Sequence, residues 1–237
     1  MKILILDSSS RSASAAICED GRLLGEYYTN NGKTHSATLL PMTEGLLRTC
    51  SLTIGEMDAL AVTVGPGSFT GLRIGMAAVK GMAFAAHLPC IPLSTLEGLA
   101  WNLQGTDALI CPVLDARVSQ VYTALFRCRD GVLTRLTEDC AIPIRELETL
   151  LHSQPDEHKI LVGDGAKLCY NKFENRPAGL VLAPEHLLYQ RAGAMAGLAW
   201  QKVQAGETLP ANEIVPAYLR LPQAERELQL KQQQKGE

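Results

Sequence analysis

The sequence predicts an α/β protein built from two copies of a βββαβα unit. Each half opens with a short apolar strand that ends in an aspartate, Asp7 in the first half and Asp115 in the second. A polar turn and a second strand then lead to an Asp-Gly pair, which is a strong signal for a hairpin turn. The hairpin glycine follows the aspartate by 14 residues in the first half, at Gly21, and by 16 in the second, at Gly131. Chance similarity between two α/β halves is the alternative to a true duplication.

The elements of the first half are placed by their apolar runs and their capping residues. Short apolar or β-branched runs predict strands, and apolar residues spaced by three or four predict helices. Thr53 and Glu56 have the spacing of a capping box, as do Ser94 and Glu97. Pro41 is expected to open or kink the first helix. The expected elements are strands at 2–6, 13–18, 22–29, 59–64 and 90–93, and helices that begin at Ser36, Thr70 and Thr95.

The second half continues in the same way, which suggests a division into two lobes. Its expected strands cover 108–114, 120–128, 132–141, 159–162 and 180–182, and its expected helices cover 145–152 and 191–204. The polar segment at 104–107 contains a glycine and is the predicted boundary. The predicted domains are a first lobe at 1–104, a second lobe at 105–221 and a flexible polar tail at 222–237.

The composition argues against several classes of function. The 237 residues are 46% hydrophobic and 20% charged, which is typical of a soluble globular protein. The net charge of −3 gives no overall excess of basic residues, so this chain alone is not expected to make the main contacts with a nucleic acid. Seven cysteines occur without a C-x-x-C pair, and five histidines lack metal-site spacing, so no metal site is expected. We expect a cytoplasmic protein without signal peptide or membrane span.

A run of small residues at 65–75 joins the expected strand at 59–64 to the next helix. Its glycines allow backbone angles that other residues resist, and Ser68 or Thr70 can cap the helix. Such a turn can hold an anion, but the run has neither the Lys-Ser/Thr of a Walker loop nor a G-x-G-x-x-G pattern. The pattern leaves two interpretations open, a tight strand-to-helix connection or an anion or nucleotide site.

The helix after this turn has two different apolar faces. Leu72, Met76 and Val79 fall on one side and form an ordinary core face. A second stripe consists of small residues and one methionine, and a stripe of this kind lets another helix approach closely. That other helix can belong to the same domain or to another chain. The residues of the stripe are Gly71, Gly75, Ala78, Met82 and Ala85.

Two aspartates are the candidates for chemistry. An aspartate at the end of the first strand of such a lobe can position a metal or a nucleotide phosphate, so Asp7 and Asp115 are expected to face each other across a cleft. Asp7 has the alternative role of accepting hydrogen bonds from the backbone of Ser9 and Ser10 in the turn that follows. No glycine follows Asp115, and 163–165 is only a fragment of a nucleoside-binding turn. No serine has the G-x-S-x-G setting of a nucleophile, so no catalytic residue is assigned.

Eight segments along the chain carry the motifs of one known family, and the run at 65–75 is the most specific of them. They are 3–9, 34–36, 40–42, 65–75, 94–96, 114–117, 121–122 and 216–220. Together they resemble the TsaB family, also called YeaZ, of bacterial tRNA threonylcarbamoyladenosine biosynthesis. The resemblance implies duplicated ribonuclease-H-like lobes of the actin-like, sugar kinase and Hsp70 type.

The resemblance implies a non-catalytic subunit, with catalysis in the related protein TsaD. TsaD and the ATPase TsaE are the implied protein partners, and tRNA is contacted through the complex. The assembly transfers threonylcarbamoyl from threonylcarbamoyl-adenylate to the adenosine beside the anticodon of ANN-decoding tRNAs. No cofactor is implied for this chain, since ATP and a metal ion belong to TsaD and TsaE.

The resemblance also implies two regions of interest in this chain. Helices of the first lobe form the implied partner surface, and the same helices allow a homodimer in isolation. A degenerate nucleotide or anion site is implied between the lobes. The rival hypothesis is a free-standing actin-like ATPase or small-molecule kinase that uses Asp7 and Asp115. The implied partner-binding residues are Gly71, Gly75, Ala78, Met82, Ala85, Leu39 and Met42, and those of the degenerate site are Asp7, Ser8, Ser9, Gly65, Gly67, Ser68 and Asp115.

Overall fold

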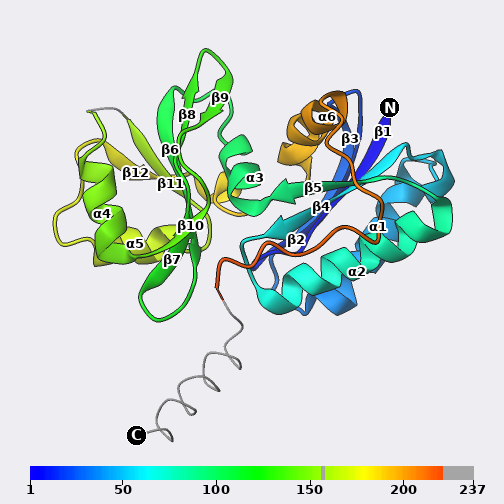
Figure 1. Cartoon of the computed structure of the whole chain (residues 1–237), viewed down its shortest axis with the longest axis horizontal. Coiled ribbons are helices and arrows are strands. Elements are labelled where there is room, and N and C mark those ends of the chain that lie inside the picture. The colour runs from blue at the N-terminus through cyan, green and yellow to red at the C-terminus, as the bar shows by residue number, and fades with distance from the viewer. Residues whose placement is uncertain (156–157, 221–237) are drawn as a thin grey trace, which may run out of the picture.

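The computed structural model describes residues 1–155 and 158–220 and consists of two α/β lobes that lie side by side (Figure 1). The first lobe has a five-stranded sheet in the order β3-β2-β1-β4-β5. Strands β1, β2 and β3 pair antiparallel, whereas β1, β4 and β5 pair parallel. The strands are β1 (Lys2–Asp7), β2 (Ala13–Glu19), β3 (Arg22–Thr29), β4 (Ala59–Gly65) and β5 (Cys90–Ser94).

The second lobe repeats this order of pairings. Its central path is β10-β7-β6-β11-β12, in which two antiparallel pairings are followed by two parallel ones. A hairpin of two further strands, β8 and β9, is added beside β6. The predicted duplication is therefore confirmed. The strands are β6 (Ala108–Asp115), β7 (Gln120–Thr123), β8 (Phe126–Arg129), β9 (Val132–Arg135), β10 (Cys140–Pro143), β11 (Lys159–Val162) and β12 (Leu180–Leu182).

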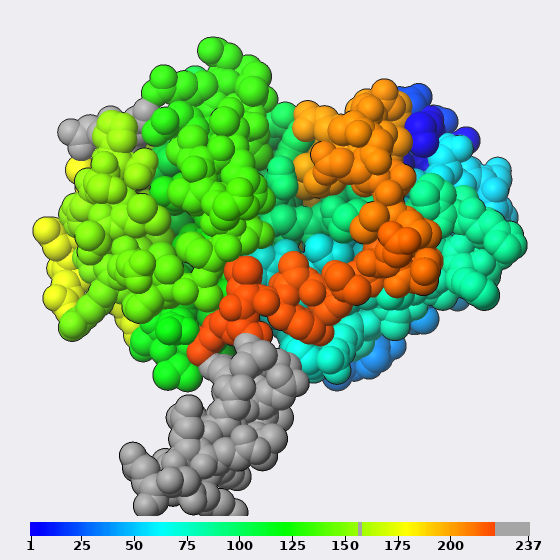
Figure 2. Space-filling model, in the orientation of Figure 1, coloured from blue at the N-terminus to red at the C-terminus, as the bar shows by residue number. Residues whose placement is uncertain are grey.

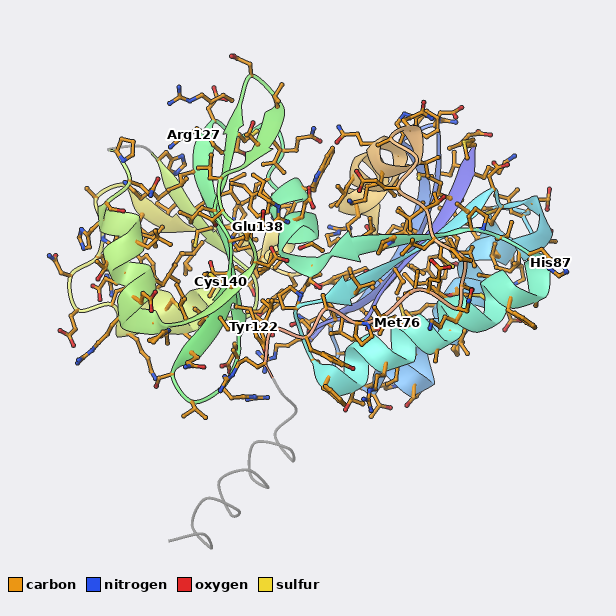
Figure 3. The ribbon with its side chains drawn as sticks, viewed as in Figure 1. Met76, His87, Tyr122, Arg127, Glu138 and Cys140 are labelled. Carbon is orange, nitrogen blue, oxygen red and sulfur yellow. The ribbon has the colours of Figure 1, made fainter. Side chains whose placement is uncertain are left out.

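Helices cover both faces of the first sheet because its central strands are apolar on both sides. The helices α1 (His35–Thr49) and α2 (Phe69–Ala86) cover the face of Leu4 and Leu6. Met76 points from α2 toward this face (Figure 3). The helix α6 (Ala196–Gln204), preceded by the 3₁₀ turn η3 (Gly193–Met195), covers the opposite face. Full burial of one such large apolar side chain contributes about 1.5–3 kcal/mol.

The remaining helices join and cover the second lobe. Helix α3 (Thr95–Trp101) lies between the lobes and packs on β5 as well as β6. Helices α4 (Ile144–His152) and α5 (Ala166–Lys172) pack beside β10 and β11 respectively. Two further 3₁₀ turns are η1 (Ile54–Glu56) and η2 (Glu185–Leu187). Among the described residues, no helix is long and apolar enough to cross a membrane.

The second lobe differs from the prediction at three places. The expected strand at 132–141 is two strands, because β9 pairs with β8 whereas β10 pairs with β7. The expected strand at 120–128 is two strands, because one edge of β6 changes partner along its length. Residues 108–110 pair with β8 and 113–115 pair with β7, and Pro112, which has no amide hydrogen to donate, lies between the two pairings. Helix α5 was not predicted, because it follows a turn with two glycines and its seven residues are too few to show a helical spacing of apolar residues.

Helix α6 packs on the first lobe, although the predicted domain boundary placed it in the second lobe. Met195 and Ala199 belong to the same buried cluster as Ile3 and Ile5 of β1. Apolar spacing identifies such a helix but cannot say which sheet it covers. The predicted tail at 222–237 lies outside the described residues.

Residues 205–220, which we call the strap, run from α6 along the first lobe to the second (Figure 2). The amide of Ala217 donates to the carbonyl of Val64 at 2.8 Å, at the end of β4. The guanidinium of Arg220 donates to the carbonyl of Ala116 at 2.5 Å, in the loop after β6. The strap therefore ties the two lobes together.

Candidate site between the lobes

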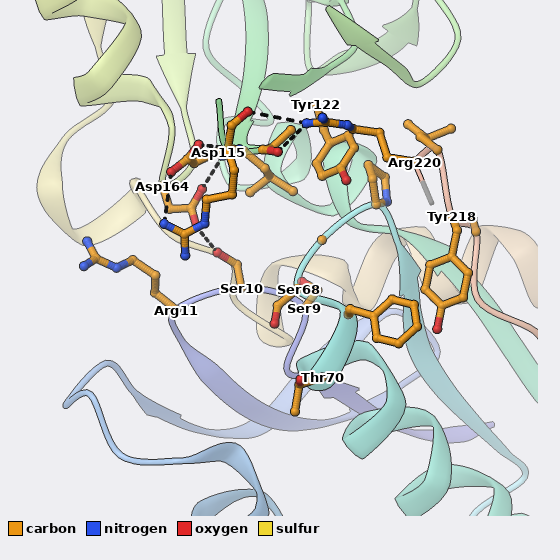
Figure 4. Close-up of a pocket in the computed structure, with 18 residues that line it drawn as sticks. Ser9, Ser10, Arg11, Ser68, Thr70, Asp115, Tyr122, Asp164, Tyr218 and Arg220 are labelled. Atoms are coloured by element: carbon orange, nitrogen blue, oxygen red, sulfur yellow. Dashed lines mark hydrogen bonds and ion pairs between the residues drawn. The ribbon is translucent and has the colours of Figure 1, made fainter. Parts of the chain in front are cut away.

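A cavity of about 540 Å³ lies between the lobes, where β1, β4 and β6 end (Figure 4). From the first lobe it is lined by two residues of the serine loop after β1 (residues 8–10), Ser9 and Ser10, by Arg11, and by residues 66–70 of the glycine turn after β4 (residues 65–71). The second lobe contributes the loops after β6 and β11, and the strap closes one side. Loops at the carboxyl ends of strands are where α/β folds place their ligands, so this cavity is the first candidate for a functional site.

The glycine turn is closed onto the serine loop. The amide of Ser68 donates to the carbonyl of Ser9 at 2.7 Å, and the hydroxyl of Ser8 donates to the carbonyl of Gly71 at 2.9 Å. A Cβ added at Gly67 would lie 2.3 Å from the carbonyl oxygen of Ser9, and one at Gly71 would lie 2.1 Å from that of Ser8. Only glycine permits such an approach of backbone to backbone. These glycines therefore serve a contact inside the first lobe.

The carboxylate of Asp7 is buried beneath this contact, with no exposed surface. Its Oδ1 accepts hydrogen bonds from the hydroxyls of Ser9 and Thr63, both at 2.6 Å, and from the Ser9 amide at 3.3 Å. Its Oδ2 has no partner among the described residues. Burial raises the pKa of Asp7, and the Ser9 and Thr63 hydroxyls oppose that shift. Asp7 thus supports the serine loop from below and does not line the cavity.

The acids that reach the cavity come from the second lobe. Asp164 accepts a hydrogen bond from the amide of Asp115 at 3.0 Å and another from the hydroxyl of Ser10 across the cleft. Burial raises the pKa of Asp164, and these two hydrogen bonds oppose the shift. Asp115 turns back onto its own loop and accepts from the amide of Arg117 at 2.8 Å. Asp164 therefore joins the lobes, a role that the turn fragment at 163–165 did not reveal in the sequence.

The expected meeting of Asp7 and Asp115 across the cleft is not found, because Asp7 lies under the serine loop. Of the residues expected at a degenerate nucleotide site, Ser9, Gly67, Ser68 and Asp115 line the cavity, whereas Asp7, Ser8 and Gly65 do not. Gly65 serves the strap instead, since a Cβ there would lie 2.7 Å from the carbonyl oxygen of Ala217. Within 1–155 and 158–220, no group of three His, Cys, Asp or Glu side chains is placed to hold a metal ion.

The burial of Asp7 gives a test of its role. The unfolded carboxyl has an ordinary pKa near 4, and the folded one is raised, so the native state binds the proton more tightly. Stability from the protonated carboxyl is therefore lost as pH rises from about 4 to the folded pKa. We expect Asp7→Asn to gain stability relative to the parent over that window, in urea unfolding at several pH values.

The exposed Asp130→Asn is the matched control for this measurement, because Asn tolerates the left-handed backbone of that hairpin position. It removes a carboxyl at an exposed position, so its pH profile is the reference with which the profile of Asp7→Asn is compared. A difference for Asp7→Asn that is flat, or that falls with rising pH, contradicts the structural role of a buried carboxylate.

Of the seven expected partner residues, three are buried inside the first lobe, three are half-buried and one is exposed. Gly71 packs on Ser8, and a Cβ at Gly75 would lie 2.6 Å from the hydroxyl of Ser8. Both glycines therefore face the serine loop of their own lobe, and their prediction as partner-binding residues is corrected. Leu39 is also buried, in the core beneath α1. Ala78, Met82 and Met42 are half-buried, and only Ala85 is exposed. Over the first half of the small-residue stripe, the segment that packs closely against it is thus a loop of the same lobe.

A different set of apolar residues faces outward on these two helices. Phe84 on α2 is 80% exposed and Leu40 on α1 is 51% exposed. Three small residues of α2, Ala77, Gly81 and Ala85, are exposed as well. We call the set the α1–α2 apolar surface, and it consists of Ala37, Leu40, Ala77, Gly81, Phe84 and Ala85. Helical spacing places Phe84 and Ala77 away from the core face, which is the signal that could have found them.

The strand orders and the cleft define the chain as an actin-like protein built from duplicated ribonuclease-H-like lobes. It belongs to the TsaB family, also called YeaZ. It is 31% identical over 228 residues to the tRNA threonylcarbamoyladenosine biosynthesis protein TsaB of Bacillus subtilis, covering 95% of this chain and 96% of that protein. The protein of the same name from Escherichia coli is 30% identical over 223 residues, covering 93% and 95%.

Solved structures agree with this assignment. YeaZ from Pseudomonas aeruginosa superimposes with a TM-score of 0.78 at 27% identity, over 92% of this chain and 99% of that one. Residues 23–227 also match the family described as TsaD, tRNA N6-adenosine threonylcarbamoyltransferase. The predicted family and fold class are both confirmed.

Proposed function

We propose that this chain is a non-catalytic subunit that binds TsaD. Together with TsaE it would support transfer of threonylcarbamoyl from threonylcarbamoyl-adenylate to the adenosine beside the anticodon of ANN-decoding tRNAs. The names of its relatives support a role in forming this modification. The observation that carries the non-catalytic assignment is the glycine turn closed over the serine loop, with Asp7 buried below. ATP and a metal ion would act on TsaD and TsaE.

The alternative, a free-standing ATPase or small-molecule kinase, is less well supported. Such an enzyme positions phosphates with free backbone amides and a carboxylate that holds a metal ion in the cleft. Here the Ser68 amide is bonded to Ser9, and Asp115 is bonded to the amide of Arg117. On the second-lobe side of the cavity, the Arg220 guanidinium donates a hydrogen bond to the carbonyl of Ala116.

The α1–α2 apolar surface supports the role of a binding subunit. An aromatic side chain that is 80% exposed, as Phe84 is, is typical of an interface anchor in the uncomplexed protein. Alanine and glycine beside it allow the backbone of a partner helix to come close. The same surface would let isolated chains form a homodimer when TsaD is absent.

Reconstitution tests the proposal directly. Purified chain alone should neither modify tRNA nor turn over ATP, whereas adding it to TsaD, TsaE, threonylcarbamoyl-adenylate and ATP should permit threonylcarbamoylation. Modified adenosine is measured by mass spectrometry of digested tRNA. Multiple turnovers of ATP by the chain alone, abolished by Asp115→Ala, would overturn the proposal in favour of the kinase.

A second expectation concerns RNA. Since the net charge is −3, the isolated chain should bind tRNA weakly, and the complex with TsaD should bind it much better. Filter binding at two salt concentrations measures this. Tight and salt-sensitive binding by the chain alone contradicts the expectation that tRNA is contacted through the complex.

A further inference from the structure

A second cavity, of about 640 Å³, lies on the first lobe between the N-terminal ends of α1 and α2. It adjoins the cavity between the lobes, since Ser10 and Arg11 line both. Three basic side chains line it, those of Arg11, Lys33 and His35, together with several hydroxyls. None of its twelve lining residues is an aspartate or a glutamate. The cavity is therefore rich in positive charge and hydrogen-bond donors.

The arginine and the lysine of this cavity have no hydrogen-bond or ion-pair partner for their side chains among the described residues. Arg11 and Lys33 are both exposed, and neither side chain forms a hydrogen bond or ion pair with any residue that the structure describes. In Figure 4, Arg11 extends away from the serine loop, and no interaction joins it to the other residues drawn. Asp164 attracts Arg11, but its carboxylate is already bonded to Ser10 and the amide of Asp115. Two positive charges are thus available to a ligand.

His35 adds an unsatisfied polar atom at the same cavity. Its Nε2 lies 2.7 Å from the carbonyl oxygen of Ser10, and since a carbonyl only accepts, Nε2 carries the proton. Its Nδ1 is buried and has no partner within 1–155 and 158–220. With the proton on Nε2, the neutral imidazole has only a lone pair at Nδ1, so a hydroxyl or a water that donates to Nδ1 would satisfy this nitrogen.

The N-terminal ends of α1 and α2 also favour a negatively charged ligand. The N-terminus of a helix carries about half a positive charge, and acidic residues usually compensate it. Neither α1 nor α2 has an acidic residue in its first turn. The side chain of Thr34, which precedes α1, makes no capping hydrogen bond. Two helix N-termini without acidic residues therefore add to the positive potential of Arg11 and Lys33.

We propose that this cavity binds a dianionic phosphoryl group, either inorganic phosphate or the terminal phosphate monoester of a metabolite. Arg11 and Lys33 supply two charges, which match a dianion better than a single carboxylate or a phosphate diester. Ser36 and Thr70 also line the cavity, and their hydroxyls can donate hydrogen bonds to a phosphoryl oxygen. The proposal does not depend on the role of the chain in tRNA modification, since it concerns the isolated first-lobe surface.

Calorimetric titration of the full-length chain tests this at constant ionic strength. The probes are inorganic phosphate, methyl phosphate as a monoester and dimethyl phosphate as a diester. We expect saturable binding of inorganic phosphate, with affinity reduced about tenfold or more in the double variant Arg11→Gln, Lys33→Gln. Arg48→Gln is the matched control, because Arg48 is an exposed cation at the other end of α1.

The outcomes separate the sources of the phosphoryl group. Methyl phosphate that binds like inorganic phosphate indicates a monoester ligand, and methyl phosphate that fails to bind indicates the free ion. Either result supports the proposal. No saturable binding of inorganic phosphate, equal binding of dimethyl phosphate, or an unchanged affinity in the double variant overturns it.

Discussion

A Phe84→Asp variant is expected to bind TsaD about 30- to 1000-fold more weakly than the parent, a loss of roughly 2–4 kcal/mol. The reason is that an interface anchor would be replaced by a charge that has to be buried without a partner. The side chain is 80% exposed in the free chain, so folding should be unaffected. Affinity by calorimetry and the melting temperature should be measured on the same sample.

Val132→Asp is the control for this variant, because Val132 is also a large exposed apolar residue, 64% exposed, but lies on the hairpin of the second lobe. It should bind TsaD as the parent does. Phe84→Asp should also reduce threonylcarbamoylation in the reconstituted system and remove any homodimer of the isolated chain. A Phe84→Asp chain that melts normally and binds TsaD with parental affinity would rule out the α1–α2 apolar surface as the interface.

Gly71→Ala is expected to destabilise the fold by about 3 kcal/mol or more. The added Cβ would lie 2.1 Å from the backbone carbonyl oxygen of Ser8, and a backbone atom cannot move aside as a side chain can. The turn and the serine loop would have to separate, which would expose Asp7. Urea unfolding measures the loss, and the variant should also lose protection of the amide of Ser68 against hydrogen exchange.

Gly81→Ala gives a matched control on the same helix. A Cβ at Gly81 would meet open space, and alanine is a better helix former than glycine by about 1 kcal/mol. Gly81→Ala should therefore be as stable as the parent or more so. Parental stability of Gly71→Ala would mean that the contact between turn and serine loop contributes little.

The order of elements was predictable from the sequence because each element has a local signal. The apolar run of β4, the serine that caps α2 and the Asp-Gly turns are all readable within a few residues. The duplication followed from the repetition of those signals. The helix α6 was recognised by its apolar spacing, yet its sheet was not, because both sheets have apolar faces that need a helix.

The candidate site was less predictable because it depends on which segments meet. Gly71 and Gly75 form a small-residue stripe whether the neighbour is a partner helix or Ser8, so the stripe alone could not decide. Asp7 ends a first strand in either role, and only its burial separates them. Asp164 gains its importance from Ser10, which is distant in the sequence. Phe84 could have been predicted, since helical spacing places it away from the core face of Leu72 and Met76.

The return of α6 and the strap to the first lobe has a consequence for synthesis of the chain. The face of β1 that carries Ile3 and Ile5 is covered by residues near 195–199, which leave the ribosome after the whole second sheet. The first lobe can therefore complete its hydrophobic core only after the second lobe has been synthesised. A fragment that ends at residue 104 would leave this apolar sheet face uncovered, so we expect the first half to need residues 192–199 to fold.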